Sequence, residues 1–329
     1  MKCMIGRIGF VAFAAMAICG CSSGLNPFGG APSDAIRVAS YNIRLEAGDR
    51  GTANAWLDRR DDMVDLIRRL DIDAGGLQEV LPDQMAFLRE RLPEFEFVGE
   101  HRGADRVSDE ASPVFYRKSR FVAEKKGTFW LSETPDVPGV KGWGAACPRV
   151  CSYLVLRDRS TGKRFCFANT HTDHVSALAR EMGMLLVIER MKEFGAGAPI
   201  VFTGDHNCRE TEAPALAVSK LLRNALYESE SAPKGPWRTF NGWQWRDKEV
   251  SIADALKLPI DMRNARKGSP DATKKNDAHM WEDCGARIDY IYVSPGVRVI
   301  DYETFADPRP GKALYPSDHF PVVSAVDVP

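Results

Sequence analysis

Asp205 and Asn207 are the residues whose types and spacing point most directly to chemistry in this sequence. They follow the apolar run 200–202, which predicts a short buried strand, and Gly204 lets the backbone turn or approach another group closely. Residues two apart on an extended backbone point to the same side, so a carboxylate and a carboxamide would face one point at the strand end. Such a pair suits a metal ion, a water molecule or a phosphoryl oxygen. An Asx-turn, in which both side chains serve the local backbone, is the alternative for this stretch.

The residues at the ends of other predicted strands favour a chemical role for Asp205 and Asn207 over a simple Asx-turn. Polar residues that can bind a metal or move a proton recur at or just past these strand ends. Because the strand ends of one sheet face one edge of a domain, we expect these side chains to converge. The set comprises Asn42, Glu79, His171, Asp205, Asn207, Asp289, Asp318 and His319.

The elements that must position these residues are strands interspersed with helices. Alternating apolar and polar residues predict the strands, and apolar residues at helical spacing predict amphipathic helices. The predicted strands are 36–42, 74–80, 114–116, 121–124, 128–131, 150–157, 164–169, 200–202, 287–293, 297–305 and 322–326. The predicted helices are 57–70, 83–92, 177–194 and 214–226.

Composition and charge narrow the function classes. The 329 residues are 44% hydrophobic and 27% charged, which is typical of a globular protein with a substantial core. Lys+Arg 44 against Asp+Glu 45 gives a formal net charge of -1, so the chain lacks the broad basic footprint of a nucleic-acid-binding protein. We expect one domain over residues 34–329, acting as a monomer.

The polar set favours metal-assisted hydrolysis of a phosphate ester. Oxygen ligands such as the Glu79 carboxylate suit Mg²⁺ or Mn²⁺ better than zinc. The sequence has no H-E-x-x-H motif, no cysteine-rich zinc spacing, no G-x-S-x-G motif and no P-loop. These absences argue against a zinc protease, a serine hydrolase and a nucleotide-driven motor.

Six sequence blocks resemble the endonuclease/exonuclease/phosphatase family of DNase I-like proteins, in the family's order and over almost the whole chain. The resemblance implies an α/β (α+β) four-layer sandwich, in which two packed mixed β-sheets are flanked by helices and the site lies at one edge. The blocks are Ser40-Tyr41-Asn42, Leu77-Gln78-Glu79-Val80, residues 169–174, residues 203–207, Arg287-Ile288-Asp289-Tyr290 and Ser317-Asp318-His319.

The resemblance implies a metal-binding group. Glu79 would be the main ligand of Mg²⁺ or Mn²⁺, Asn42 would lie close to the metal and the phosphate, and Asp318 would support the metal or its water shell. The metal would stabilise the charge that develops on the phosphoryl group.

It also implies roles in phosphate binding and proton transfer. Asp205 would position or deprotonate the attacking water, and Asn207 would hold a non-bridging phosphate oxygen. His319 would donate to the phosphate, with Asp289 fixing its orientation, because a neighbouring carboxylate favours the protonated imidazole. His171 would lie near the leaving group.

Two features depart from the family pattern. His206 stands where the family usually carries an apolar residue, often Phe; we assign it to the core, and contact with substrate or metal is the alternative. No run of basic residues marks a DNA-binding groove, which argues against a nuclease. Arg149 is interpreted as a surface arginine, with phosphate contact as the alternative.

The specificity-determining parts of the chain do not reveal the substrate. Three polar segments, 44–56, 100–112 and 237–276, are expected to decide between a nucleic acid, a lipid, an inositol phosphate and a sugar phosphate. An aromatic cluster in the last segment is assigned to the core, with stacking on substrate as the alternative. It comprises Trp237, Phe240, Trp243 and Trp245.

The N-terminus predicts export. Lys2 and Arg7 precede a short apolar run, 8–18, which fits a signal peptide and is too short for a comfortable transmembrane helix. The following Ile18-Cys19-Gly20-Cys21 resembles a bacterial lipobox, so residues 1–20 are predicted to be a lipoprotein signal peptide with Cys21 the lipidated first residue. Residues 21–33, rich in Gly, Pro and Ser, are predicted to be a flexible tether. We therefore expect a protein outside the cytoplasm, anchored to a membrane by its N-terminal lipid.

The remaining cysteines leave the disulfide pattern open. Their number is odd, so at least one thiol would be free, and their spacing shows no C-x-x-C pair. They are Cys147, Cys151, Cys166, Cys208 and Cys284. A lipid-anchored binding protein with a vestigial catalytic site is the alternative function, although no member of the polar set is missing.

Overall fold

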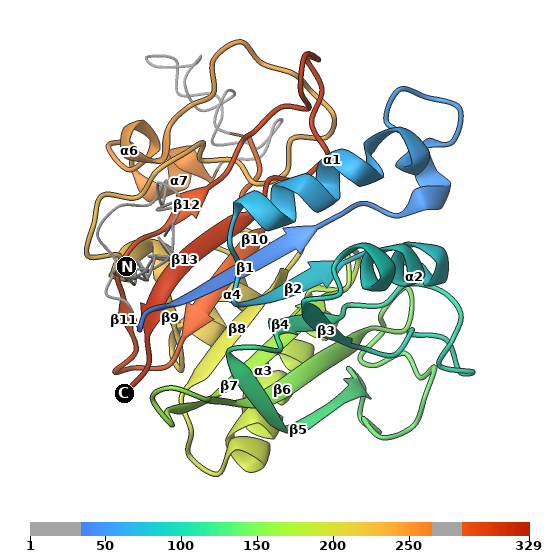
Figure 1. Ribbon diagram of the computed structural model, residues 1–329. Helices are drawn as coiled ribbons and strands as arrows, with labels where there is room; N and C mark the ends of the chain where they lie inside the picture. The colour runs from blue at the N-terminus through green and yellow to red at the C-terminus, as the bar shows by residue number, and fades with distance from the viewer. Residues whose placement is uncertain (1–33, 265–284) are drawn as a thin grey trace, which may run out of the picture. The chain divides into compact units, whose positions relative to one another are not determined.

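A computed structural model of the protein describes residues 34–264 and 285–329, which form a two-sheet sandwich (Figure 1). The predicted signal peptide, tether, lipidation site Cys21 and Cys284 lie outside these ranges. Among the described residues, no helix has the length and apolar character needed to span a membrane.

The first sheet has the strand order β11-β13-β1-β2-β4-β3, with β12 also paired to β13. Its β1 and β2 run parallel, and its other neighbours are antiparallel, so the sheet is mixed. The strands are β1 (Ile36–Asn42), β2 (Ala74–Gln78), β3 (Phe95–Val98), β4 (Val114–Arg117), β11 (Arg298–Val299), β12 (Glu303–Thr304) and β13 (Val322–Asp327).

The second sheet has the order β5-β6-β7-β8-β10-β9, and β7 and β8 are its parallel pair. Its strands are β5 (Phe121–Trp130), β6 (Val150–Asp158), β7 (Arg164–His171), β8 (Ile200–Asp205), β9 (Arg223–Asn224) and β10 (Asp289–Val293). Apolar side chains such as Val38, Val114, Phe167 and Ile291 fill the core between the sheets.

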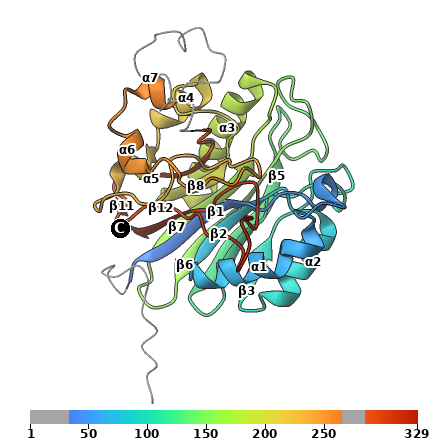
Figure 2. The ribbon, with the colours of Figure 1, turned by 90° about the horizontal axis from the view of Figure 1, so that it is seen from above.

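Helices cover the outer faces of both sheets (Figure 1, Figure 2). On the second sheet, Met184, Val187 and Met191 of α3 pack in one apolar cluster with Val155 and Phe202. The helices are α1 (Trp56–Arg69), α2 (Pro82–Arg91), α3 (Ala177–Gly195), α4 (Ala213–Ser219), the short α5 (Ala225–Glu228), α6 (Ile252–Ala255) and α7 (Ile260–Arg263), with the 3-10 helix η1 (Glu46–Asp49). The predicted four-layer arrangement is confirmed.

Four predicted elements differ from the structure. The strands predicted at 121–124 and 128–131 are one edge strand, β5, where exposed charged side chains are tolerated because they face solvent. The helix predicted at 214–226 is α4, β9 and α5, because β9 pairs with β10 and Asn224 caps α5 through a bond from Leu226 N. The strand predicted at 297–305 is the pair of two-residue strands β11 and β12.

Candidate active site

Strand register brings polar residues of both sheets to one edge. In the second sheet His171 pairs with Asp205, and Asp205 pairs with Asp289. In the first sheet Asn42 ends β1, and Glu79 directly follows β2. The parallel and antiparallel pairings therefore place the predicted strand-end residues next to one another.

Asn42 joins the two sheets at the centre of the site. Its Nδ2 donates to Glu79 Oε1 at 2.9 Å and to Asp205 Oδ2 at 3.0 Å. Glu79 has a left-handed backbone with φ 63, and its Oε2 accepts from Leu45 N at 3.0 Å. This uncommon backbone turns the carboxylate toward Asn42 rather than onward along the strand.

Asp205 and Asn207 form an Asx-turn and also direct their side chains into the site. Asn207 N donates to Asp205 Oδ1 at 3.0 Å, which is an Asx-turn, and both side chains still reach the site. Asn207 Nδ2 donates to His171 Nε2 at 2.9 Å and to Thr172 O at 3.0 Å. Because both amide hydrogens are engaged, Asn207 would have to exchange one of these bonds to hold a phosphate oxygen.

The carboxyl of Asp205 lies in an environment that favours its protonated form. Burial, reinforced by the charge of Asp289, raises the pKa of Asp205 to about 7, although His319 opposes the rise. A carboxyl with a pKa near neutrality is suited to accept a proton from water.

His319 is held by Asp289 on a loop tied to β1. Ser317 Oγ donates to Asn42 O at 2.7 Å, and His319 Nδ1 lies 2.8 Å from Asp289 Oδ2. Burial alone would lower the pKa of His319, but Asp289 and Asp205 outweigh it and raise the pKa to about 10. The imidazolium form can therefore donate through Nε2, which lies 3.7 Å from Asp205 Oδ2.

Glu110 is a site residue that the sequence did not single out. His171 Nε2 accepts from Asn207, so Nδ1 carries the ring proton and faces Glu110 Oε2 at 3.9 Å. Arg102 holds Glu110 with two bonds, at 2.9 and 3.1 Å. Burial, followed by the charge of Arg149, lowers the pKa of His171. Glu110 lies in the polar loop 100–112, which has no periodicity from which its position could be read.

Arg44 is the second residue that the sequence analysis missed. Its Nε lies 2.9 Å from Asp49 Oδ2 and 3.7 Å from Asp318 Oδ2, and its Nη1 lies 4.0 Å from Glu79 Oε2. Burial raises the pKa of Asp318, and the charge of Glu79 reinforces the rise. Arg44 thus partly offsets the crowding of acidic groups in the site.

The carboxylates present fit a divalent cation. Glu79 and Asp205 each place a potential oxygen ligand within 4.8 Å of the other and of a His319 nitrogen, and His319 in its imidazolium form is not itself a ligand. The raised pKa values of Asp205 and Asp318 have the same cause, which is the burial of neighbouring carboxyl groups. A cation among these oxygens would offset the cost of burying them as carboxylates.

Six of the eight predicted polar residues line a cavity of about 660 Å³, and the other two, Asn42 and Asp289, are bonded to Asp205 and His319 from behind. Arg149 is 5% exposed and lines this cavity, so its assignment to the protein surface is wrong. Phe240 and Trp243 also line it, whereas Trp237 is fully buried and Trp245 stacks on Tyr315. The aromatic cluster is therefore divided between core, cavity and surface.

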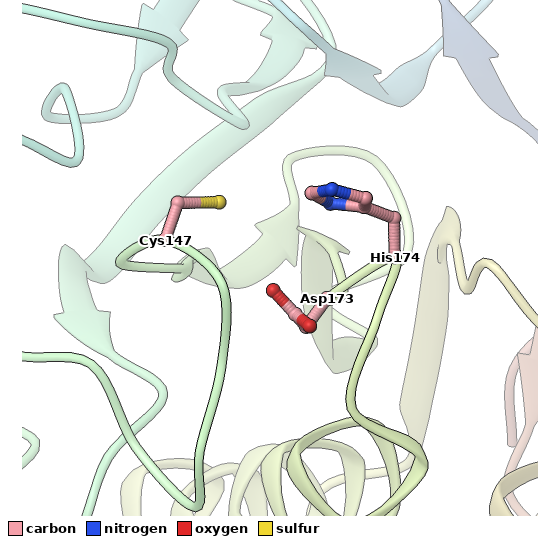
Figure 3. Close-up of side chains that lie close together, drawn as sticks. All are labelled: Cys147, Asp173 and His174. Carbon is pink, nitrogen blue, oxygen red and sulfur yellow. The ribbon is translucent and has the colours of Figure 1, made fainter.

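A second group of potential ligands lies at the Arg149 side of the cavity. Cys147, Asp173 and His174 converge there, with the Cys147 sulfur directed toward the His174 ring (Figure 3). Asp173 already accepts backbone N–H bonds from Ala146, Val175 and Ser176. Arg149 supplies the neighbouring positive charge, with Nη2 3.0 Å from His174 Nδ1 and Nε 3.8 Å from Asp173 Oδ2.

The remaining cysteines and His206 belong to the interior. The four cysteines in the described ranges are free thiols, and three of them, Cys151, Cys166 and Cys208, are buried. His206 is fully buried and stacks on Tyr290 and Tyr292, with the Phe202 ring tilted against it. The side chain therefore faces the core, away from Asp205.

Similar proteins share the fold over most of the chain. An endonuclease/exonuclease/phosphatase family protein of Bacteroides thetaiotaomicron is 32% identical, with a TM-score of 0.71 over 89% of this chain and 94% of that one. A mannosyl-6-phosphatase of the same bacterium is 31% identical, with a TM-score of 0.70 over 89% and 99%. The human Nocturnin catalytic domain, 17% identical with a TM-score of 0.61 over 90% and 95%, shares the fold.

Matches among curated sequences are more distant. Nocturnin of Drosophila melanogaster is 24% identical over 88% of this chain and 46% of its own length. The chain spans about half the length of the curated relatives that it matches, between 36% and 59%. The profile described as "Endonuclease/Exonuclease/phosphatase family" matches residues 39–319. This chain therefore belongs to the endonuclease/exonuclease/phosphatase family.

Proposed function

We propose that this protein is a phosphoester hydrolase that depends on Mg²⁺ or Mn²⁺ and uses in-line attack by an activated water. Phosphoester hydrolysis is the activity that the family and its phosphatase relatives support. The observation that carries the proposal is the position of Asp205, hydrogen-bonded to Asn42 and close to Glu79 and His319. A water-activating carboxyl, a metal-binding carboxylate and an imidazolium donor thus surround one point.

Each of this chain's residues has a defined task in this mechanism. Glu79 would hold the cation, with Asn42 and Asp318 beside it, and the bound cation would supply charge stabilisation to the phosphoryl oxygens. Asp205 takes a proton from the attacking water, and His319, oriented by Asp289, donates to a phosphoryl oxygen. Asn207 holds a phosphoryl oxygen after exchanging one of its present bonds. His171, whose Nδ1 proton faces Glu110, would lie beside the leaving oxygen.

A phosphate monoester of a sugar is the substrate class that we propose. The mannosyl-6-phosphatase relative is 31% identical and is covered over 99% of its length, so its type of substrate is a reasonable choice for this chain. The absence of a basic sequence run and the net charge of -1 favour a small ester over nucleic acid.

The experiment is hydrolysis of a phosphate-ester panel by the purified chain with Mg²⁺ or Mn²⁺. We expect a chelator to abolish turnover and added metal to restore it. Asp205→Asn should reduce kcat roughly a hundredfold to ten-thousandfold, as expected for loss of a positioned base. Asp136→Asn is the matched control, since the Asp136 side chain is 80% exposed. Turnover unaffected by chelation, or fully retained in Asp205→Asn, would contradict the proposal.

We also propose that the protein acts outside the cytoplasm, anchored by lipid on Cys21. The charged start, apolar run and lipobox-like residues support this proposal. Cys21→Ala should remove incorporation of a clickable fatty acid and release the protein from the membrane fraction. Unchanged lipid labelling in Cys21→Ala would contradict it.

A further inference from the structure

We propose that Arg149 and His174 form a hydroxyl-recognition wall that binds the uncharged, hydroxylated part of a sugar phosphate. The inference rests on the proposed phosphoester hydrolysis and assigns the part of the cavity that contacts the leaving alcohol. It makes these two residues determinants of specificity rather than of the chemical step.

The hydroxyl-recognition wall adjoins the leaving-group side of the site. Asp205 Oδ2 lies between two imidazoles, 3.5 Å from His171 Nε2 and 3.7 Å from His319 Nε2. The Phe240 ring is tilted against His319, with ring centroids 5.0 Å apart. Arg149 lies at the His171 end of β7, because it directly precedes β6, whose Cys151 pairs with Thr170. An alcohol leaving toward His171 therefore passes to the Arg149 side of the cavity.

Arg149 retains hydrogen-bonding capacity that a ligand can use. Among the described residues, its guanidinium makes one side-chain hydrogen bond, to His174 Nδ1, and its Nε has no acceptor. Asp173 Oδ2 lies 3.8 Å from Arg149 Nε and balances its charge. The Asp173 oxygens already accept hydrogen bonds from three backbone N–H groups. Arg102, whose Nε also lacks an acceptor within the described ranges, differs in that its terminal nitrogens are already bound to Glu110 and Asp109. A buried cation with unused donors is poised to accept new partners.

His174 adds a second donor to the wall. Arginine can only donate, so the 3.0 Å contact makes His174 Nδ1 the acceptor and leaves the ring proton on Nε2. His174 is exposed and lines the cavity. The wall therefore presents N–H donors, which match the lone pairs of hydroxyl oxygens.

The charges around the wall select a neutral group over a second phosphate. Arg102 and Arg149 contribute two positive charges, and Asp109, Glu110 and Asp173 contribute three negative ones. A second phosphate, or the next phosphate of a nucleic-acid strand, would meet a net acidic region. Hydroxyl groups carry no such penalty, so a hexose phosphate fits better than a nucleotide chain.

This arrangement also explains why the Cys147, Asp173 and His174 group is not proposed as a metal site. The Arg149 guanidinium already bonds the His174 nitrogen and faces the Asp173 carboxylate, so a metal cation would be repelled there. Cys147 instead provides a reporter, because its thiol lies on the same wall and points toward His174 (Figure 3).

The first test compares mannose 6-phosphate with ethyl phosphate, a monoester of a primary alcohol without hydroxyl groups. Arg149→Met should lower the ratio of kcat/KM for mannose 6-phosphate to that for ethyl phosphate roughly 10- to 100-fold, since bonds to a charged donor are lost. Arg157→Met is the matched control, because Arg157 lies on β6, the strand that Arg149 directly precedes, and pairs with Glu124 outside the cavity. A ratio unchanged in Arg149→Met overturns this inference alone. A wild type that hydrolyses no phosphate ester overturns the proposed function as well.

The second test does not depend on turnover or on the folding of Arg149→Met. In Asp205→Asn with Mg²⁺, mannose 6-phosphate should slow N-ethylmaleimide labelling of Cys147 several-fold, as read by mass spectrometry of the Cys147 peptide. Ethyl phosphate at the same occupancy should not. Equal protection by both esters, or protection by neither, overturns the inference.

Discussion

His206→Phe is expected to make the stability of this protein less sensitive to acid. The imidazole is fully buried, stacked with Tyr290 and Tyr292 and in contact with the tilted ring of Phe202. Neither ring nitrogen has a well-formed hydrogen bond, although the Thr203 backbone lies close. Phenylalanine would remove these nitrogens, whose desolvation costs about 1–3 kcal/mol, while its larger ring costs a similar amount in repacking. Near pH 8 the two effects should nearly cancel.

The magnitude of the acid effect follows from the pKa of His206. Burial lowers this pKa to about 3, although the charge of Asp289 opposes the shift. The unfolded chain binds the proton with a pKa of about 6.5, so it holds more protons than the folded chain below that pH, and stability falls as the pH drops. A pH of about 5 lies about 1.5 pH units below the pKa of the unfolded imidazole, so protonation of this group stabilises the unfolded chain by about 2 kcal/mol. The phenylalanine variant should lack this loss.

Urea unfolding at about pH 8 and pH 5 measures the effect, with a chelator present so that metal binding does not contribute. The free energy of unfolding should fall by about 2 kcal/mol less in His206→Phe than in the wild type over this interval. Tyr292→Phe is the matched control, because Tyr292 lies in the same stack and does not titrate between these pH values. Equal pH dependence in the wild type and His206→Phe would refute the reasoning.

Three further predictions concern the supports of the site and the sheets. Glu110→Gln should lower kcat roughly tenfold or more, because His171 loses the carboxylate that faces its Nδ1 proton, and steady-state kinetics would expose an unchanged kcat as a contradiction. Asp158→Asn should lower the free energy of unfolding by about 2 kcal/mol above about pH 4. The reason is that hydrogen bonds from Ser160 and Arg120 outweigh the effect of burial and lower the pKa of Asp158 to about 2. Acid titration of stability should show this deficit vanish as the pH falls through about 2. Arg59→Met should cost about 3 kcal/mol or more, because its buried guanidinium bonds four backbone carbonyl groups; a loss under about 1 kcal/mol in urea unfolding would be inconsistent with that role.

The sequence was sufficient to predict which strand ends carry the polar residues. The patterns of β1, β7, β8 and β10 placed their ends within three residues. Strand pairing brings His171, Asp205 and Asp289 together, and a side-chain hydrogen bond joins Asn42 to Asp205. The resemblance supplied the family and the two-sheet sandwich, which the comparisons confirm. The chemical roles of these residues stay predictions.

Loop residues of the site could not be predicted, because a loop has no hydrophobic periodicity from which the direction of a side chain could be inferred. Glu110 reaches His171 through the pairing of Ala111 with Val80, a contact between distant segments. Arg149 directly precedes β6, and no sequence pattern indicates that its side chain is buried beside His174. Local patterns report which face of an element is apolar, but they do not report where two loops meet.

The position of the site follows from a polar seam between the two sheets. Gln78 Nε2 donates to Asn169 Oδ1 at 2.6 Å, and Asn169 Nδ2 donates to Leu77 O at 2.7 Å, so β2 and β7 are bonded face to face. A Cβ on Gly76 would collide with the Asn169 side chain, which is why glycine is required there. Such a buried network costs free energy if one sheet slides, because its donors would lose their acceptors. The same register places Asn42 directly beside Gln78, and it places Asp205 two residues beyond Thr203, the partner of Asn169. The packing of the interior therefore fixes the geometry of the site.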